Sequence, residues 1–197
     1  MEKNNNLSAV ILCGGKALRM GGVNKAFIEV EGASILNRTI NIFKDIFKEV
    51  ILVTNTPEQY KEYKNDAVII TDIIKGVGPL GGIYAALINT SKQGVFVVAC
   101  DMPFIDKELI IKEIDCFNSL ETNVLVPRVL DRIEPLHAVY SKCLSPSIKE
   151  FISSGKSYAI KIYLKTVKVD YFDLENNDLN RKVFLNLNST EDFAGLK

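Results

Sequence analysis

An apolar run that passes directly into a glycine-rich, positively charged loop constrains this chain more than any other feature. The run ends at residues 10–12 (VIL) and is typical of a buried strand. The loop after it holds four glycines and three cations: Gly14, Gly15, Gly21, Gly22, Lys16, Arg19 and Lys25. Glycines let backbone N–H groups approach an anion closely, and the cations neutralise its charge. The segment therefore predicts a phosphate-binding turn at the end of a strand.

The spacing of this loop fits neither of two common phosphate-binding patterns. A Walker A loop requires G-x-x-x-x-G-K-[ST], whereas three residues separate Gly21 from Lys25. A dinucleotide-binding G-x-G-x-x-G is broken because Lys16 occupies its third position. The whole chain has a formal net charge of +0, and no basic stripe continues beyond the loop, so nucleic acid is not expected as a partner.

Strands and helices alternate along the rest of the chain, and no linker or repeat divides it. Strands are expected at residues 8–12, 50–54, 68–71, 95–99, 123–127 and 135–140, with two more near 168–171 and 183–185. Helices are expected at 34–47, 57–64, 80–91, 107–120, 142–153 and 158–164, with a last one starting at Ser189. This alternation predicts an α/β fold, a three-layer sandwich with a mostly parallel, Rossmann-like sheet. We interpret residues 1–197 as a single domain, with 1–6 as a flexible tail.

Two acidic residues directly follow apolar strands. Asp72 comes after the third expected strand and Asp101 after the fourth. In parallel α/β sheets, ligands bind outside the carboxyl ends of the strands, which is also where the glycine loop lies. Mg²⁺ typically takes one or two carboxylates and completes its coordination with phosphate oxygens and water. The sequence therefore predicts a nucleotide bound together with a divalent metal at this edge.

The motifs resemble, in order, those of the molybdenum cofactor guanylyltransferase family, the MobA-like nucleotidyltransferases. The first loop is similar to the family pattern L-A-G-G-x-S-x-R-M-G-x-x-K, with Cys13 in place of Ala and Ala17 in place of Ser. The segments VIITD with GPLGG, VVACDMPF, EPLHAVY and LNLNSTEDF resemble the later motifs, although Ser189 and Thr190 stand where Thr-Pro is usual. The resemblance covers nearly the whole chain.

The resemblance implies an activity and its partners. Members of this family transfer GMP from GTP to the molybdopterin-bound molybdenum cofactor, giving the guanine dinucleotide cofactor and pyrophosphate. We therefore expect GTP and molybdenum cofactor as ligands, Mg²⁺ as cofactor, and transient contacts with proteins that deliver or accept the cofactor. No signal peptide or membrane-spanning run is apparent, and four scattered cysteines with one histidine favour reduced thiols in the cytoplasm over a zinc site.

Specific residues take roles by the same resemblance. The implied nucleotide-binding residues are Leu12, Gly14, Gly15, Lys25, Asp72 and Asp101, with Asp72 on the guanosine part of GTP. The implied catalytic residues are Lys25, Arg19 and Asp101. Asp101 would bind the metal, with Asn188 as a second polar group beside it.

Three alternatives remain at this stage. A cytidylyltransferase or another nucleotidyltransferase of the same fold would use the same residues, although Gly14 favours the larger guanine base. An NAD-dependent oxidoreductase would use residues 76–81 (GVGPLG), a G-x-G-x-x-G match in which Pro79 lacks the N–H that pyrophosphate needs. A non-catalytic nucleotide-binding module would not need both Lys25 and Asp101. His137 is expected to be packed in a strand and not catalytic.

Overall fold

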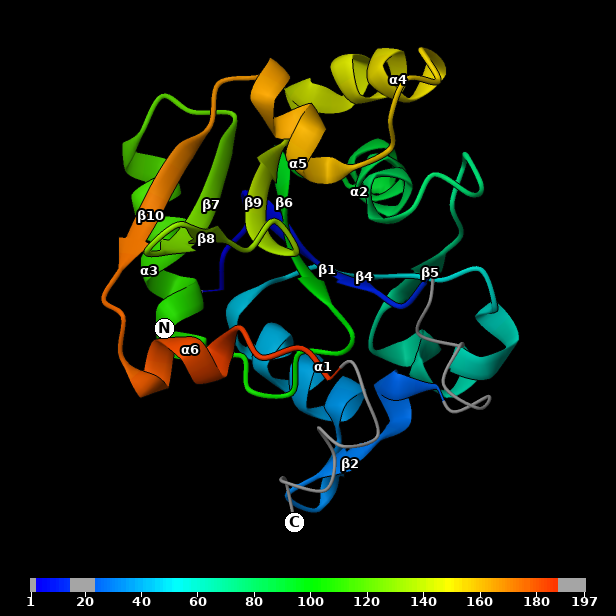
Figure 1. The fold of residues 1–197 in the computed structure, drawn as a ribbon. Coiled ribbons are helices and arrows are strands. Elements are labelled where there is room, and N and C mark those ends of the chain that lie inside the picture. The colour runs from blue at the N-terminus through cyan, green and yellow to red at the C-terminus, as the bar shows by residue number, and fades with distance from the viewer. Residues whose placement is uncertain (1–2, 15–23, 188–197) are drawn as a thin grey trace.

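The computed structural model describes residues 3–14 and 24–187 of the chain (Figure 1). Its main sheet is built from eight strands: β1 (Leu7–Leu12), β4 (Val50–Val53), β5 (Val68–Ile70), β6 (Gly94–Ala99), β7 (Val124–Val129), β8 (Arg132–Ile133), β9 (His137–Ser141) and β10 (Asp170–Leu174). The order across the sheet is β10–β7–β9–β6–β1–β4–β5, with β8 paired to β7. A separate hairpin joins β2 (Glu29–Val30) to β3 (Ala33–Ser34).

Strand direction confirms the predicted, mostly parallel sheet. β1 lies parallel to both β4 and β6, β4 is parallel to β5, and β10 is parallel to β7. Only β9 and the short β8 reverse this direction in the main sheet, and β9 is antiparallel to both of its neighbours. Because β9 runs backwards, its first residue, His137, lies beside Val98 near the carboxyl end of β6.

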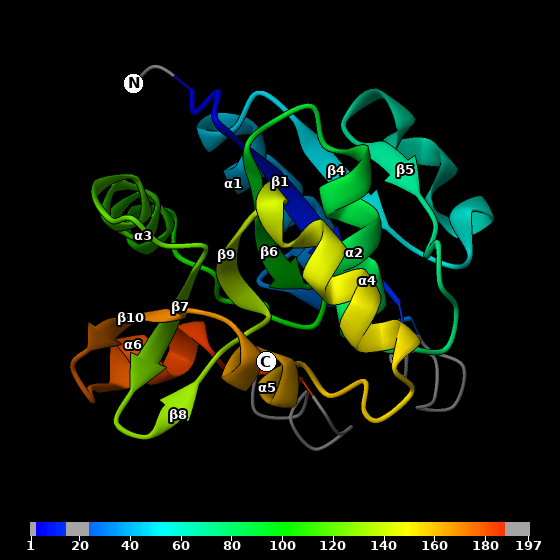
Figure 2. The same ribbon diagram turned by 90° about the horizontal axis from the view of Figure 1, so that it is seen from above.

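Helices cover both faces of this sheet, as expected for a three-layer sandwich (Figures 1 and 2). They are α1 (Ile35–Ile46), α2 (Pro79–Asn89), α3 (Lys107–Ser119), α4 (Ser145–Ser153), α5 (Ile160–Tyr163) and α6 (Asp178–Val183). Alternate residues of β1 point to opposite faces, so Ala9 and Ile11 join the core under α1 and α3, whereas Val10 and Leu12 join the core under α2 and α4. The predicted fold class is therefore confirmed.

Local sequence signals explain where α1 begins. The Ser34 hydroxyl accepts a hydrogen bond from the Asn37 amide at 3.2 Å, which satisfies one of the free N–H groups of the first turn. Leu36, Ile40 and Phe43 then recur on one buried face. The hairpin before α1 was not predicted. Its turn residues, Glu31 and Gly32, have φ values of 52° and 83°, as the tight turns of two-residue hairpins require.

The predicted strand near residues 183–185 is wrong, because α6 ends at Val183 and residues 184–185 follow it as a turn and irregular chain. Asn177 caps the helix by accepting a hydrogen bond from the Asn180 amide at 2.9 Å, and Asp178 favours the first turn electrostatically. The apolar residues of this short stretch suggested a strand, whereas the capping residue before them sets the structure. Residues 57–64 form a 3₁₀ helix (Pro57–Asn65), and the helix expected from Ser189 lies outside the described residues.

Two further findings concern the expected tail and membrane segments. Asn4 forms a parallel bridge with Phe47, so the described part of the expected N-terminal tail contacts the domain. Within the described residues, no helix has the length and hydropathy needed to cross a bilayer.

Candidate active site

Four neighbouring parallel strands end at the same edge of the sheet and bring the predicted residues together. Backbone hydrogen bonds continue the pairing just past the strand ends: the Cys13 amide donates to Val53 at 2.8 Å, and the Cys100 amide donates to Leu12 at 3.2 Å. Gly14 after β1 and Asp101 after β6 are therefore held next to each other in the sheet order. The predicted nucleotide-binding residue Leu12 supplies a carbonyl to this junction.

Asp72 is held by Asn55, a residue that the sequence analysis missed. The Asn55 Nδ2 atom donates to Asp72 Oδ2 at 2.7 Å. A Cβ atom added to Gly14 would lie 4.0 Å from Asn55 Nδ2, and one added to Gly82 would lie 3.5 Å from Asp72 Oδ1. Asn55 comes just after β4, so the rule that found Asp72 and Asp101, inspection of the residues beyond each strand, could have found it too.

Gly82 also lets α2 approach the sheet beside Asp72. A Cβ atom at this position would meet the Leu12 side chain at 2.9 Å, which is closer than real side chains come. The GPLGG segment therefore acts as a packing contact that brings the start of α2 against β1 and β4.

Gly76 and Gly78 have positive φ values of 80° and 67°, but Gly76 lies well beyond the end of β5 at Ile70. This placement does not fit a dinucleotide fingerprint, in which the glycines follow the strand directly.

Lys25 and Asp101 face each other at this edge. The Lys25 Nζ atom lies 3.7 Å from Asp101 Oδ2, and the two side chains are 8% and 22% exposed. This separation is too long for a strong hydrogen bond, so the two charges attract each other without closing a tight pair. Burial raises the pKa of the Asp101 carboxyl, and the nearby Lys25 ammonium offsets only part of that effect. A further cation or donor near Asp101 would therefore be favourable.

Lys25 owes its position to a neighbour that was also missed. Asn24 caps the 3₁₀ helix Lys25–Phe27 by accepting a hydrogen bond from the Ala26 amide at 3.1 Å. The Asn24 Nδ2 atom donates to the Tyr60 hydroxyl at 2.8 Å, which ties this turn to the buried Tyr60 ring. The cap and this hydrogen bond hold the backbone from which the Lys25 side chain extends.

A divalent cation fits the donor set at Asp101. Within residues 3–14 and 24–187, no group of three histidine, cysteine or acidic residues could hold a metal by itself. Mg²⁺ commonly needs only one or two carboxylates when a nucleotide supplies phosphate oxygens. An incompletely balanced, partly open carboxylate such as that of Asp101 meets this requirement.

The last part of the described chain returns to the same place. The Leu187 amide donates to the Asp101 carbonyl at 3.0 Å, and the Leu187 side chain is fully buried against Val30 and Ile35. The structure thus gathers five predicted residues at one edge of the sheet: Leu12, Gly14, Lys25, Asp72 and Asp101. The other predicted residues, Gly15, Arg19 and Asn188, lie outside the described residues.

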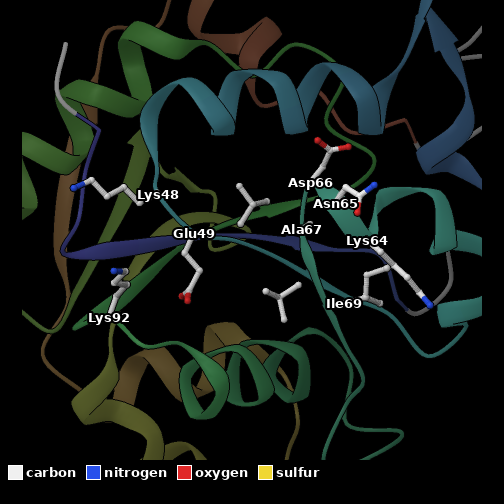
Figure 3. A pocket seen from close by; sticks show the side chains of 10 residues that line it. Lys48, Glu49, Lys64, Asn65, Asp66, Ala67, Ile69 and Lys92 are labelled. Carbon is white, nitrogen blue, oxygen red and sulfur yellow. The ribbon is translucent and has the colours of Figure 1, made fainter.

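A groove of about 660 Å³ lies at the opposite edge of the sheet (Figure 3). Its lining includes Lys48, Glu49, Lys64, Asp66 and Lys92, from the amino ends of β4 and β5 and the segments beside them. The size of this groove does not make it the nucleotide site, because ligands of parallel sheets bind at the carboxyl ends.

Comparison with known proteins identifies relatives of this chain. The family model for the MobA-like NTP transferase domain matches residues 9–167. The probable molybdenum cofactor guanylyltransferase of Peptoclostridium acidaminophilum is 36% identical over 94% of this chain and 86% of its own length. The molybdenum cofactor guanylyltransferase of Syntrophotalea carbinolica is 35% identical over 94% of this chain and 88% of its own.

Solved structures share the fold. Molybdopterin-guanine dinucleotide biosynthesis protein A from Archaeoglobus fulgidus has a TM-score of 0.79 at 23% identity, covering 96% of each chain. A Mycobacterium tuberculosis protein solved in complex with manganese has a TM-score of 0.70 at 15% identity, covering 98% of each chain. At these identities the likeness concerns the fold alone, whereas the family rests on the matches above. The predicted family and enzyme class are confirmed: this chain belongs to the MobA-like NTP transferases, a family of nucleotidyltransferases.

Proposed function

We propose that this protein transfers GMP from GTP to the molybdopterin-bound molybdenum cofactor. The observation that carries the proposal is the buried Lys25 facing Asp101 beside Gly14, in a chain whose relatives bear this activity in their names. An oxygen of the acceptor's terminal phosphate attacks the α-phosphorus of GTP. The bond between that phosphorus and the bridging oxygen to the β-phosphate breaks, and pyrophosphate leaves with the electron pair.

This reaction needs charge stabilisation more than it needs a general base. The terminal phosphate of the acceptor is largely ionised at neutral pH, since the second pKa of a phosphate monoester is about 6. Catalysis then depends on positioning and on neutralising the phosphate oxygens. Lys25 supplies a preorganised positive charge, fixed by Asn24 and largely shielded from water. We assign Arg19 to the same task on the leaving pyrophosphate.

We assign Mg²⁺ to Asp101, with Asn188 as the second polar group of that site. When bound, the ion would withdraw charge from the phosphate oxygens of GTP. The Asp101 carboxyl, whose pKa is raised by burial, gains a counter-charge there, and the Leu187 amide fixes its backbone carbonyl. The manganese complex of the Mycobacterium tuberculosis protein with this fold supports a divalent cation.

We assign the guanosine part of GTP to Asp72 and its surroundings. Asn55 holds one oxygen of the Asp72 carboxylate, so the side chain is oriented before the nucleotide arrives. The carboxylate can accept hydrogen bonds from nucleoside N–H or hydroxyl groups. Gly14 beside Asn55 leaves room where a larger residue would add a side chain.

A thermal-shift panel tests the nucleotide. The protein is heated with Mg²⁺ and GTP, CTP, ATP or NAD, each in large excess. A ligand at 100 times its Kd adds about 2.7 kcal/mol, which raises the midpoint by roughly 5–10 °C in a chain of this size. A shift selective for GTP is the expected result. A selective shift with CTP would instead support a cytidylyltransferase of the same fold, and a shift with NAD alone would overturn the proposal.

Turnover distinguishes the enzyme from a module that only binds nucleotide. With GTP, Mg²⁺ and molybdenum cofactor present, we expect pyrophosphate release that requires the acceptor. GTP binding without such release would favour the non-catalytic alternative.

We place this protein in the cytoplasm. Its four free cysteines, of which Cys13 and Cys100 are buried, fit that reducing compartment. We also propose transient contacts there with proteins that deliver or accept the cofactor.

A further inference from the structure

A buried pair of ionisable side chains lies next to the candidate active site and has no role in the chemistry proposed above. Glu113 on α3 and His137 on β9 are 1% and 0% exposed, and His137 Nε2 lies 3.2 Å from Glu113 Oε2. Among the described residues, none of the four polar side-chain atoms of this pair makes a well-aligned hydrogen bond. Burial raises the pKa of the Glu113 carboxyl, and His137 offsets part of that effect.

Stability alone does not explain this pair. Burying two ionisable side chains without well-aligned hydrogen bonds is costly, and replacing a buried pair by apolar side chains of similar volume is often neutral or stabilising. The pair therefore suggests a requirement for one orientation of the imidazole ring.

The contacts of two phenylalanine rings with His137 depend on the orientation of the imidazole. The His137 ring lies 5.1 Å from the ring of Phe96 on β6 and 5.2 Å from the ring of Phe184, with interplanar angles of 84° and 85°. Both are edge-to-face contacts, and this geometry changes if the imidazole plane turns. The Glu113 carboxylate beside Nε2 opposes such a turn, so it helps to maintain the contact between His137 and Phe184.

Phe184 belongs to a C-terminal strap, defined here as residues 178–187, which comprises α6 and the residues after it. The strap contacts the loop between β6 and α3, which contains both Asp101 and Phe104, at two points. The Lys182 ammonium lies 4.3 Å from the ring centroid of Phe104, and the Leu187 amide donates to the Asp101 carbonyl at 3.0 Å. Figure 1 shows α6 at the lower left, below β10 and α3, with the red segment after it leading toward α1. The position of the strap and the position of Asp101 are therefore linked.

We propose that Glu113 and His137 are positioning residues that dock the C-terminal strap and, through it, hold the Asp101 backbone. Glu113 fixes the imidazole, the imidazole seats Phe184, and the strap then presents the Leu187 amide to Asp101. The docking step stands on the contacts alone. Its consequence for metal use rests on the proposed function, in which Asp101 binds Mg²⁺.

Limited proteolysis of the full chain tests the docking step. Arg181 and Lys182 are exposed trypsin sites on α6, and cleavage there requires the strap to open. In Glu113→Met, which removes the carboxylate at similar size, we expect cleavage after these residues to accelerate about tenfold, because cleavage follows the population of the open form. Glu113→Gln should restore near wild-type rates, because it keeps a side chain of the same size with a polar oxygen beside His137 Nε2.

Two more variants separate positioning from general packing. Phe184→Leu weakens the same contact from the strap side and leaves the buried pair in place, so it answers the question even if Glu113→Met does not fold. Phe47→Leu is the matched control, because Phe47 is buried in the same core and its ring lies 6.0 Å from that of Phe96, the residue that also contacts His137. Unchanged cleavage in both Glu113→Met and Phe184→Leu would overturn the proposal, as would equal acceleration in Phe47→Leu.

The Mg²⁺ concentration for half-maximal activity tests the second step. We expect it to rise about tenfold in Glu113→Met and Phe184→Leu, the lower end of the range typical when a supporting group of a metal site is lost, and to stay unchanged in Phe47→Leu. Faster cleavage with an unchanged Mg²⁺ requirement would overturn the link from the strap to Asp101. If Asp101→Asn also left the requirement unchanged, the error would lie in the proposed metal site and not in strap docking.

Discussion

The carboxylates at the two edges of the central sheet differ in the partners that surround them. At the amino edge, the Glu49 carboxylate accepts hydrogen bonds from the hydroxyls of Ser8, Thr90 and Ser91, the last two at 3.0 Å. At the carboxyl edge, Asp101 faces Lys25 at 3.7 Å. Both carboxylates are partly shielded from water. Only the one at the amino edge is closely surrounded by hydrogen-bond donors within the described chain.

The pKa shifts express this difference. Burial acts to raise the pKa of the Glu49 carboxyl, but the hydrogen bonds from Ser8, Ser91 and Thr90 outweigh it and leave the pKa below its usual range. For Asp101, burial prevails over the attraction of Lys25 and the pKa is raised. The Glu49 cluster therefore links β1 and the start of β4 to the end of α2. At the carboxyl edge, the negative charge of Asp101 is only partly balanced, so a bound cation can balance the rest.

The groove at the amino edge shows why volume is a poor guide to the site. Lys48, Lys64 and Lys92 line it, which makes it look suited to an anion (Figure 3). Its acidic groups already have partners: Glu49 has its hydroxyls, and Asp66 pairs with Lys44. The incomplete balance of charge at the carboxyl edge, and not the size of a hollow, marks the candidate active site.

The sharpest test of this contrast removes one lysine from each edge. Lys25→Ala should lower kcat by roughly 10²-fold or more, the usual loss for one preorganised charge-stabilising group. Lys48→Ala, from the amino-edge groove, is the control and should leave kcat unchanged. Steady-state release of pyrophosphate measures both. Equal activity of the two variants would remove Lys25 from the mechanism.

A second test compares two acidic residues. Asp101→Asn should raise the Mg²⁺ concentration for half-maximal activity by at least about tenfold, because a neutral amide replaces the carboxylate ligand. Asp66→Asn makes the same chemical change at the amino edge and should have no effect on this value. Titration of activity with Mg²⁺ compares them. If Asp101→Asn kept the wild-type metal dependence, the metal would bind elsewhere.

A smaller effect is expected at the residue that orients Asp72. Asn55→Ala removes the 2.7 Å hydrogen bond to the Asp72 carboxylate, a loss worth about 1 kcal/mol. The KM for GTP should therefore rise about fivefold while kcat changes little, because Asn55 acts on nucleoside binding and not on the phosphates. A fall in kcat with an unchanged KM would contradict this assignment.

The smallest effect belongs to the amino edge and appears only in stability. Glu49→Gln should lower the free energy of unfolding by about 1 kcal/mol or less at neutral pH, discounted because the site is partly exposed, and should leave activity unchanged. Because the folded pKa is below the ordinary 4.5, the carboxylate contributes stability above that pH and loses it as the pH falls further. Urea denaturation at pH 7 and pH 3 should show this acid loss in the wild type and less of it in Glu49→Gln.

Much of the site was predictable because its signals lie in adjacent residues. An apolar run followed by glycines or an acid identifies both a strand and the side chain just beyond it, and parallel strands bring such ends together. Gly14, Lys25, Asp72 and Asp101 were found in this way or through the family motifs built on it. The same rule, applied after β4, would also have found Asn55.

The sequence by itself thus determined the α/β sandwich, the edge at which ligands bind and the charged residues placed there. Only the tertiary structure decided which partners hold those residues: Tyr60 under Asn24, Asn55 beside Asp72, Glu113 against His137, and Leu187 on the Asp101 carbonyl. These contacts join residues far apart in the chain, so no local spacing encodes them. They form because folding places separate strand ends, helices and the C-terminal strap against one another, and burial then strengthens the interactions between their polar groups.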